Sequence, residues 1–259
     1  MIPNWYLTTL WLGPIPIHVW GLFVAVGFAV AIWVAVRRAP RVGIEPTHVV
    51  DAAVWVIVAS FLGARIVHVF AYEPAYYLAH PDEIVKVWEG GLSSFGGFIG
   101  ATIVGIWYVR RRKLPLLRFS DLILGVLPFG FIIGRGGGCH LTRMHPGVAT
   151  ERWFGVLFPD GVRRLDMGFF EALLWIVIAI ALLVFRKPLD GEGRVTAFVL
   201  SSYGIGRFLL DFLRVGDATY FGLTPAQYGS IVLFFFGVAL FCKARGVTRR
   251  GGPPPRAIA

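Results

Sequence analysis

The stretch VWGLFVAVGFAVAIWVAVRR, residues 19–38, decides the fold class. Residues 19–36 carry no charge, and the apolar run ends at Arg37 and Arg38. A helix of about 20 apolar residues is long enough to cross the ~30 Å hydrocarbon core of a bilayer. Six further runs of this kind follow. The expected spans are residues 19–36, 50–71, 92–109, 119–135, 168–185, 195–213 and 224–242. The sequence therefore predicts an all-α polytopic membrane protein with seven transmembrane helices.

The composition supports a membrane protein and excludes an ordinary soluble domain. Of 259 residues, 56% are hydrophobic and 15% are charged, whereas about a quarter are charged in a typical soluble protein. The formal net charge of +10 does not indicate a nucleic-acid partner, because lysines and arginines gather in the cytoplasmic loops of membrane proteins.

Most of the basic residues fall in alternate connections between the expected spans. They cluster at 37–41, 110–118 and 186–194, and again in the tail after 242. By the positive-inside rule, the N-terminus is outside and the C-terminus is cytoplasmic. We expect one transmembrane domain over residues 1–242, followed by a basic, disordered cytoplasmic tail over residues 243–259.

Three arginines fall within or at the ends of the expected spans. An arginine in the middle of a transmembrane helix raises the free energy of membrane insertion by roughly 2.5–3.5 kcal/mol. We therefore expect such an arginine to have a function. The topology places Arg65, Arg135 and Arg207 at similar depth in the outer leaflet, where guanidinium groups can hold a phosphate through paired hydrogen bonds. The alternative is that each one snorkels to the surface or pairs with a carboxylate. Arg207 can pair in this way with Asp211 at i+4, and Glu171 at the start of the fifth span is another possible partner.

The stretch IIGRGGGCHLTRMHPG, residues 132–147, places several reactive groups in one glycine-rich segment. His140 and His145 can act as bases, because histidine titrates near neutral pH, and Arg143 can add a phosphate contact. Solvated loop histidines are the simpler interpretation. Metal binding by Cys139 and the two histidines is a weaker alternative, because a zinc site needs three or four regularly spaced ligands. We expect no metal and no cofactor.

Six motifs resemble one family when taken in their order and spacing. They are LGPIPIHVWGL, GARI, VWEGGLSSFGGFIG, IIGRGGG, YGIGRFLLDFLR and GLTPAQYGSI. Together they are similar to the bacterial phosphatidylglycerol–prolipoprotein diacylglyceryl transferases over nearly the whole chain.

The resemblance implies an enzyme that moves diacylglycerol from phosphatidylglycerol to the lipobox cysteine of a prolipoprotein, forming a thioether. It also implies a multi-pass protein of the bacterial inner membrane. Its partners would be membrane lipid and the prolipoprotein signal peptide, and its active site would face the periplasm. We expect a monomer.

The resemblance also assigns roles to residues of this chain. Arg135, after Gly134, matches the arginine that contacts the lipid phosphate, and Arg207 and Tyr203 match the essential arginine and tyrosine of the sixth span. Asp211 matches a position where the family usually has glutamate. Gly96 and Gly97 also match family positions, as do Gln227 and Glu171, whose roles are less defined.

Several positions depart from the family pattern. Phe95 replaces the histidine proposed as general base, and Gly138, Leu141 and Arg143 replace two asparagines and a glutamate. Loss of a general base costs about 10²–10⁴-fold in rate. The sequence therefore leaves two readings open: a transferase that uses His140 or His145 instead, or a silent paralogue that only binds phospholipid headgroups. A small-anion transporter is a third reading, but it predicts basic residues in both halves of the membrane.

Overall fold

The computed structural model describes residues 6–87, 90–185, 189 and 191–249. The chain divides into two compact units, residues 1–34 with 120–259 and residues 35–119. We call them the first and the second unit.

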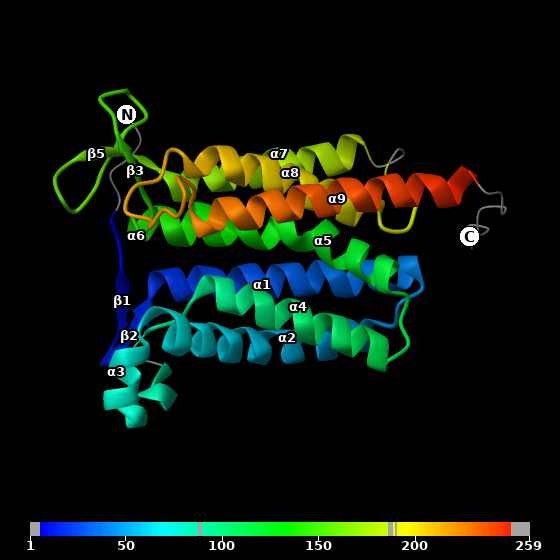
Figure 1. The fold of residues 1–259 in the computed structure, drawn as a ribbon, viewed down its shortest axis with the longest axis horizontal. Helices are drawn as coiled ribbons and strands as arrows, with labels where there is room; N and C mark the ends of the chain where they lie inside the picture. The colour runs from blue at the N-terminus through cyan, green and yellow to red at the C-terminus, as the bar shows by residue number, and fades with distance from the viewer. Residues whose placement is uncertain (1–5, 88–89, 186–188, 190, 250–259) are drawn as a thin grey trace. The chain divides into compact units, whose positions relative to one another are not determined.

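Helices dominate the described chain (Figure 1). The helices of at least 18 residues in this part of the chain are α1 (Val19–Arg38), α2 (Pro46–Val67), α4 (Ser94–Arg111), α5 (Leu116–Ile133), α7 (Met167–Val184), α8 (Arg194–Asp211) and α9 (Pro225–Arg249). Each expected span overlaps one of them. Short helical segments cover Ala39–Val42, His68–Tyr72, α3 (Pro74–Ala79), Pro81–Val85, Gly134–Cys139 and α6 (His140–Thr142).

Five of the long helices are apolar enough to cross a membrane, namely α1, α2, α5, α7 and α9. Their outer faces carry exposed apolar side chains such as Phe61, Val177 and Phe235, which suits contact with lipid. Helix α8 has the required length but contains Arg194, Arg207 and Asp211. The chain is thus a mainly helical membrane protein, and the count of seven spans stays a prediction.

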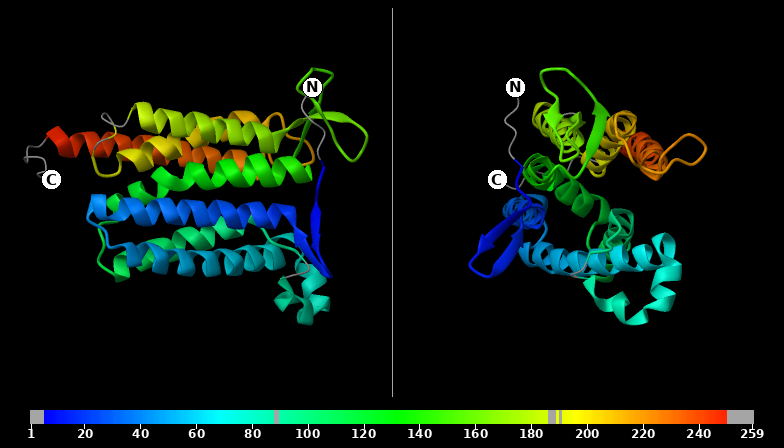
Figure 2. Two further views of the ribbon diagram at one scale, coloured as in Figure 1. Left: turned by 180° about the vertical axis from the view of Figure 1, so that it is seen from behind. Right: turned by 90° about the vertical axis from the view of Figure 1, so that its left-hand side faces the viewer.

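In the first unit, α7, α8 and α9 run side by side (Figures 1 and 2). The core of this bundle is built on Trp175 and Ile178 of α7 and Val199 of α8. Trp175 stacks on Phe131 of α5 with ring centroids 4.6 Å apart and on Tyr203 of α8 at 4.7 Å. Such aromatic pairs add about 0.5–1.5 kcal/mol beyond the burial of their area.

Glycines set the closest helix approaches in both units. In the first unit, a Cβ on Gly27 of α1 would lie 2.6 Å from the Gly130 carbonyl oxygen of α5. In the second unit, a Cβ on Gly63 of α2 would lie 2.5 Å from the Gly96 carbonyl oxygen of α4. Small residues of this kind let membrane helices pack backbone to backbone.

The connections contain short strands that the all-α expectation did not include. Strands β1 (Thr9–Leu12) and β2 (Ile15–His18) form an antiparallel hairpin. Strands β3 (Pro146–Ala149), β4 (Val156–Leu157) and β5 (Arg163–Asp166) form an antiparallel sheet in the order β3-β5-β4. Hydropathy detects only the spans, and these strands are too short to give a periodic signal of their own.

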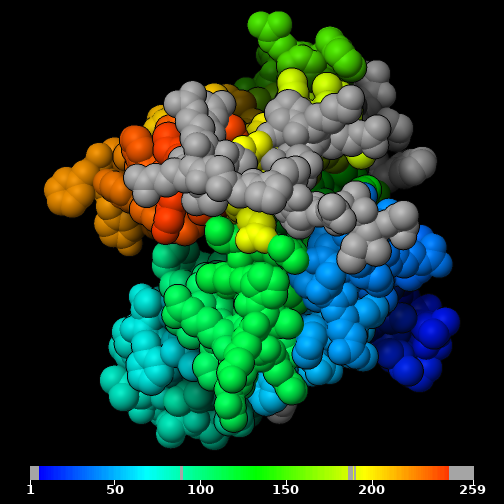
Figure 3. All heavy atoms as spheres, turned by 90° about the vertical axis from the view of Figure 1, so that its right-hand side faces the viewer, coloured from blue at the N-terminus to red at the C-terminus, as the bar shows by residue number. Residues whose placement is uncertain are grey.

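The last long helix extends beyond the expected end of the seventh span. Helix α9 continues to Arg249 instead of ending at 242, because helix formers such as Lys243 and Ala244 follow and the first helix-breaking run begins only at Gly251. The rest of the expected tail, 250–259, lies outside the described residues. Arg110, Arg111 and Arg112, at the end of α4, are exposed. Figure 3 shows the molecule from the side where green atoms of the middle of the chain are exposed.

Candidate active site

The candidate site lies at one end of the helix bundle of the first unit. Helices α5 and α8 end there, whereas α7 and α9 begin there. Arg135 follows α5, Glu171 lies in the first turns of α7, Arg207 and Asp211 lie near the end of α8, and Gln227 begins α9. Antiparallel packing therefore brings four segments that are distant in sequence to one place.

The glycines of Gly134–Cys139 allow this segment to pass close to its neighbours. The segment forms a π-helical turn. A Cβ on Gly137 would overlap the Phe23 ring of α1, and a Cβ on Gly138 would lie 3.1 Å from Phe23 Cβ and 3.3 Å from the Trp20 carbonyl oxygen. A side chain at 138 has little room beside α1, which gives a physical reason why glycine stands where the family pattern has asparagine.

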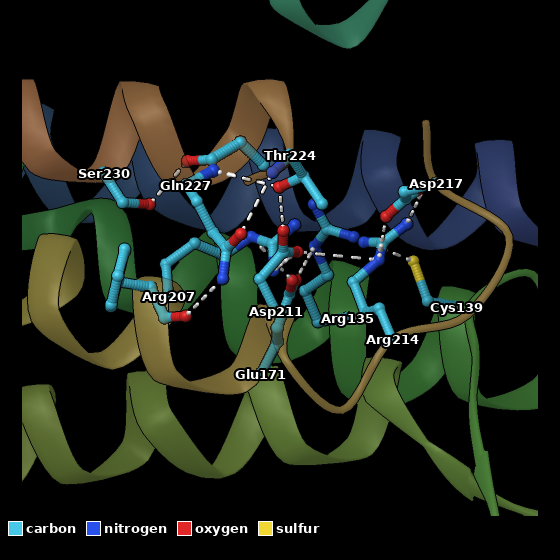
Figure 4. A network of polar contacts seen from close by, with 12 residues as sticks. Arg135, Cys139, Glu171, Arg207, Asp211, Arg214, Asp217, Thr224, Gln227 and Ser230 are labelled. Atoms are coloured by element: carbon cyan, nitrogen blue, oxygen red, sulfur yellow. Dashed lines mark hydrogen bonds and ion pairs between the residues drawn. The ribbon is translucent and has the colours of Figure 1, made fainter. Parts of the chain in front are cut away.

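Arg135 and Arg207 meet at Glu171, which is 1% exposed (Figure 4). Arg135 Nε lies 2.9 Å from Oε2 of this carboxylate, and Arg207 Nε lies 3.3 Å from Oε1. Arg207 Nη1 also pairs with Asp211 Oδ1 at 2.5 Å. Among the described residues, Nη2 of each guanidinium has no polar partner, and the two side chains remain 20% and 10% exposed. Donors are thus left for a ligand.

Asp211 is in turn fixed by the start of α9. Thr224 Oγ1 donates a hydrogen bond to Asp211 Oδ2. The backbone N–H of Gln227 donates to Thr224 Oγ1 at 3.1 Å, and the Thr224 N–H donates to Gln227 Oε1 at 3.0 Å. This reciprocal pair is a capping box, in which the first residue and the third helical residue satisfy each other's backbone N–H groups. The TPAQ sequence, with Pro225 at the first helical position, carries that signal.

Arg214 extends the network, although the sequence analysis did not select it. Its Nε lies 2.8 Å from Asp217 Oδ2 and 3.8 Å from Asp211 Oδ1. The spacing of Asp211 and Arg214 at i, i+3 is a signal that could have identified the pair. The network therefore joins three guanidiniums to three carboxylates, of which Glu171 and Asp211 are buried and Asp217 is partly exposed.

His145 reports the electrostatic effect of these arginines. It lies between α6 and β3, beyond the end of the candidate span that contains α5. Burial and the positive charges of Arg135, Arg214 and Arg207 lower the pKa of His145 to about 3. Its imidazole is therefore neutral at physiological pH, and the field that acts on it is positive.

Comparison with known proteins identifies the family. A model of the family described as prolipoprotein diacylglyceryl transferase matches residues 7–243. The phosphatidylglycerol–prolipoprotein diacylglyceryl transferase of Symbiobacterium thermophilum is 31% identical over 239 residues, which cover 88% of this chain and 89% of the relative. The protein of that name from Bordetella parapertussis is 32% identical over 242 residues (89% and 92%), and that from Agrobacterium fabrum 30% over 268 residues (95% and 95%).

The chain belongs to the prolipoprotein diacylglyceryl transferase family. The match includes every residue of the network around Glu171, so this network lies within the part that defines the family.

Tyr203 lies next to this network, in the aromatic stack with Trp175. The charges of Glu171, Arg135 and Arg207 all act on this tyrosine. The sequence-predicted set of Arg135, Arg207, Tyr203 and Asp211 is thus brought together. Gly134 directly precedes Arg135, and a Cβ there would lie 3.9 Å from Val24 Cγ2.

Arg65 belongs to the second unit, where its guanidinium holds a loop. It donates hydrogen bonds to the carbonyl oxygens of Ile84 (2.8 Å), Glu83 (2.5 Å), Gly90 (2.8 Å) and Gly91 (3.0 Å). The side chain also lies over the Tyr77 ring, 4.9 Å from its centroid. These contacts account for a buried arginine at this position, so the structure gives Arg65 an anchoring role, whereas the sequence predicts a phosphate contact.

Gly96 and Gly97 also lie in the second unit, on α4. A Cβ on Gly96 would overlap the Gly63 carbonyl oxygen, so this glycine is required for the packing of α2 on α4. Gly97 is less restricted, since its nearest neighbour would be the Ser60 carbonyl oxygen at 3.5 Å. Phe95 is 53% exposed on the same helix. Two open cavities of about 400 and 580 Å³ lie further along α4, beside Trp107 and Arg111, and no expected site residue lines them.

Arg143 and His140 form a separate cluster with Asp166. His140 Nδ1 lies 2.7 Å from Asp166 Oδ2, and Arg143 Nη1 lies 2.8 Å from the same oxygen. Arg143 is 4% exposed, has a left-handed backbone (φ 53°) and donates to the His140 carbonyl oxygen at 2.6 Å. Its partner is therefore a carboxylate within the fold. Sequence analysis missed Asp166, although an aspartate just before an apolar helical run is an N-cap signal.

Proposed function

We propose that this protein transfers the diacylglyceryl group of phosphatidylglycerol to a cysteine thiol of prolipoproteins, the first step of lipoprotein maturation. The observation that carries the proposal is the convergence of Arg135 and Arg207 on Glu171 in a member of this family. Two guanidiniums from different helices, held by one buried carboxylate, present remaining N–H donors in a fixed arrangement.

The reaction needs positive charge where the phosphate leaves. The sulfur of the acceptor forms a bond to the terminal glyceryl carbon, and the bond between this carbon and the phosphate oxygen breaks. Glycerol phosphate then carries away the electron pair, and the thiol proton is taken by a base. Stabilisation of developing negative charge is usually the largest catalytic contribution, and Arg135 and Arg207 supply it here.

The arrangement of the chain in the membrane is part of the same proposal. Seven spans with the N-terminus outside put the ends of α5 and α8, and so the network, at the outer face of the bacterial inner membrane. A lipid headgroup reaches this level while its acyl chains stay in the hydrocarbon layer. The acceptor is the lipobox cysteine that follows a signal peptide. The protein acts as a monomer, because one chain contains both Arg135 and Arg207.

The experiment is complementation of a bacterial strain depleted of its own diacylglyceryl transferase, read by the gel shift of a model prolipoprotein. We expect the wild-type chain to restore growth and the shift. Arg207→Ala should restore neither, whereas Arg164→Ala, which breaks an exposed pair with Asp160, should act as wild type. No rescue by a wild-type chain that is present in the membrane would contradict the proposal.

A further inference from the structure

The base that accepts the thiol proton is still to be assigned, because phenylalanine stands at position 95 and cannot take a proton. The structure distinguishes the two histidines of the glycine-rich segment. His145 is a poor base, since burial and three arginines lower its pKa to about 3. His140 has a different environment, in which a carboxylate contacts one ring nitrogen.

The contact with Asp166 determines which nitrogen of His140 can accept a proton. His140 Nδ1 lies 2.7 Å from Asp166 Oδ2. An ionised carboxylate only accepts hydrogen bonds, so Nδ1 carries the hydrogen and Nε2 of the neutral ring has a lone pair. Arg143 Nη1 lies 3.1 Å from Nδ1. This nitrogen can only donate hydrogen bonds, and it donates one to Asp166 Oδ2. An aspartate that fixes the tautomer of a histidine in this way is a recurrent device of enzymes with an activated nucleophile.

Asp166 is itself held rigidly. Its other oxygen, Oδ1, accepts the backbone N–H of Phe169 at 3.2 Å and so caps the N-terminus of α7. Asp166 is 2% exposed, and Arg143 balances its charge. The His140 side chain keeps 16% exposure, and its ring lies 5.8 Å from that of Phe169. The positioning groups are thus buried, while the imidazole still reaches the surface of the fold.

The position of His140 relative to the arginines follows from the packing of two antiparallel segments. Arg135 pairs with Glu171. His140, five residues after Arg135, pairs with Asp166, which lies five residues before Glu171. The backbones of the two segments lie close together between the two pairs, since a Cβ on Gly168 would lie 2.8 Å from Cys139 Cβ. His140 and Arg135 thus belong to neighbouring ion pairs that join the same two segments, at the end of the bundle where α5 and α8 stop.

We propose that His140 accepts the thiol proton of the prolipoprotein cysteine at Nε2 and that Asp166 is its positioning residue. This proposal rests on the proposed transferase function. The proton moves from sulfur to Nε2 as the carbon–sulfur bond forms, and the imidazolium then returns it to the departing glycerol phosphate. The charged groups that contact the imidazole are Asp166, at the end of β5, and Arg143, on the same segment as His140.

The test uses the purified full-length protein, phosphatidylglycerol vesicles and a prolipoprotein with one lipobox cysteine, assayed from pH 5.5 to 9. His140→Ala should lower kcat by about 10²–10⁴-fold with an unchanged KM for the lipid, and added imidazole should restore part of the rate. Asp166→Asn should lower kcat with an unchanged KM for the lipid, because the amide no longer holds the proton of His140 on Nδ1. His80→Ala, at an exposed histidine of the second unit, should leave the rate and its pH profile unchanged.

Three results would overturn the assignment. In the first, His140→Ala keeps the wild-type rate and pH profile. In the second, it loses activity that imidazole does not restore while its melting temperature falls, which indicates a structural role. In the third, ¹⁵N spectra of wild-type histidines place the His140 proton on Nε2. An inactive wild-type protein would instead refute the transferase function, and the ¹⁵N measurement would still test the pairing with Asp166.

Discussion

Arg135 and Arg207, from different helices, share the two oxygens of one buried carboxylate. Their Nε atoms lie 2.9 and 3.3 Å from opposite oxygens of Glu171. A carboxylate that is 1% exposed is tolerated in such a place only when it is paired and hydrogen-bonded. Glu171 therefore fixes the separation of the two guanidiniums, and the following consequences can be measured.

Glu171→Gln should destabilise the protein strongly. The substitution leaves two buried guanidiniums without their common counter-charge, and removing one partner of a buried ion pair costs about 3–5 kcal/mol. Thermal unfolding in detergent measures the effect. Asp160→Asn removes an exposed carboxylate that pairs with Arg164 and should leave the melting temperature unchanged. If the Glu171→Gln variant had the melting temperature of the wild type, the shared contact would contribute nothing to stability.

Gly137→Ala should destabilise the glycine-rich segment, because the new Cβ would overlap the Phe23 ring. Overpacking of this kind costs about 1–3 kcal/mol. Gly229→Ala on α9 is the matched control, since a Cβ there meets nothing within 4 Å, and it should be neutral or stabilising. The double variant with Phe23→Ala should recover part of the loss; additive effects of the two substitutions would argue against direct overlap.

His145 should make the folded state sensitive to acid. Its pKa is about 3 in the folded chain and about 6.5 when unfolded. Between these values the unfolded state binds a proton that the folded state does not, so stability falls as pH decreases below 6.5, by at most about 1.4 kcal/mol per pH unit. Above pH 6.5 this contribution does not vary with pH.

His145→Asn should therefore flatten the dependence of unfolding free energy on pH between 6.5 and 4, whatever constant offset the substitution adds. Chemical denaturation at pH 8, 6.5, 5 and 4 gives the comparison, with His80→Asn as control. Parallel curves for wild type and His145→Asn would mean that His145 titrates normally in the folded protein.

Arg65→Lys should loosen the segment that Arg65 holds through four carbonyl oxygens. Lysine keeps the charge but lacks the planar fork of donors. Hydrogen exchange at the amides of Glu83 and Lys86 should become about tenfold faster, since even one lost buried hydrogen bond is worth about 1–3 kcal/mol. Lys86→Ala, which breaks an exposed pair with Asp82, should leave the exchange at Glu83 unchanged.

The sequence predicts the long helices well, because each depends on a local apolar run. The strands around 146–166 and the extension of α9 to Arg249 were not predicted, since neither changes the hydropathy pattern. In the site, Arg135, Arg207, Tyr203 and Asp211 were identified, because arginines in apolar helices are conspicuous.

The partners of these residues depend on tertiary packing and were predicted less well. Glu171 was identified only as an alternative partner of Arg207 and not as the link to Arg135. Arg214 and Asp166 were missed, and Arg143 was assigned to phosphate although its contact is Asp166. Arg65 shows the same limit, because nothing in its own helix indicates that it binds the carbonyl oxygens of a loop about twenty residues later.

In the proposed reaction, Arg135 and Arg207 hold the phosphate during diacylglyceryl transfer. The most direct measurement is mass spectrometry of a prolipoprotein incubated with purified protein in phosphatidylglycerol vesicles. Wild type should add one diacylglyceryl mass to the lipobox cysteine. Arg135→Lys and Arg207→Lys should lower the rate by about 10²–10³-fold, the usual effect of removing one donor to a developing anion, and Arg164→Lys should not. No adduct with wild type, or full rates with both lysine variants, would contradict the account.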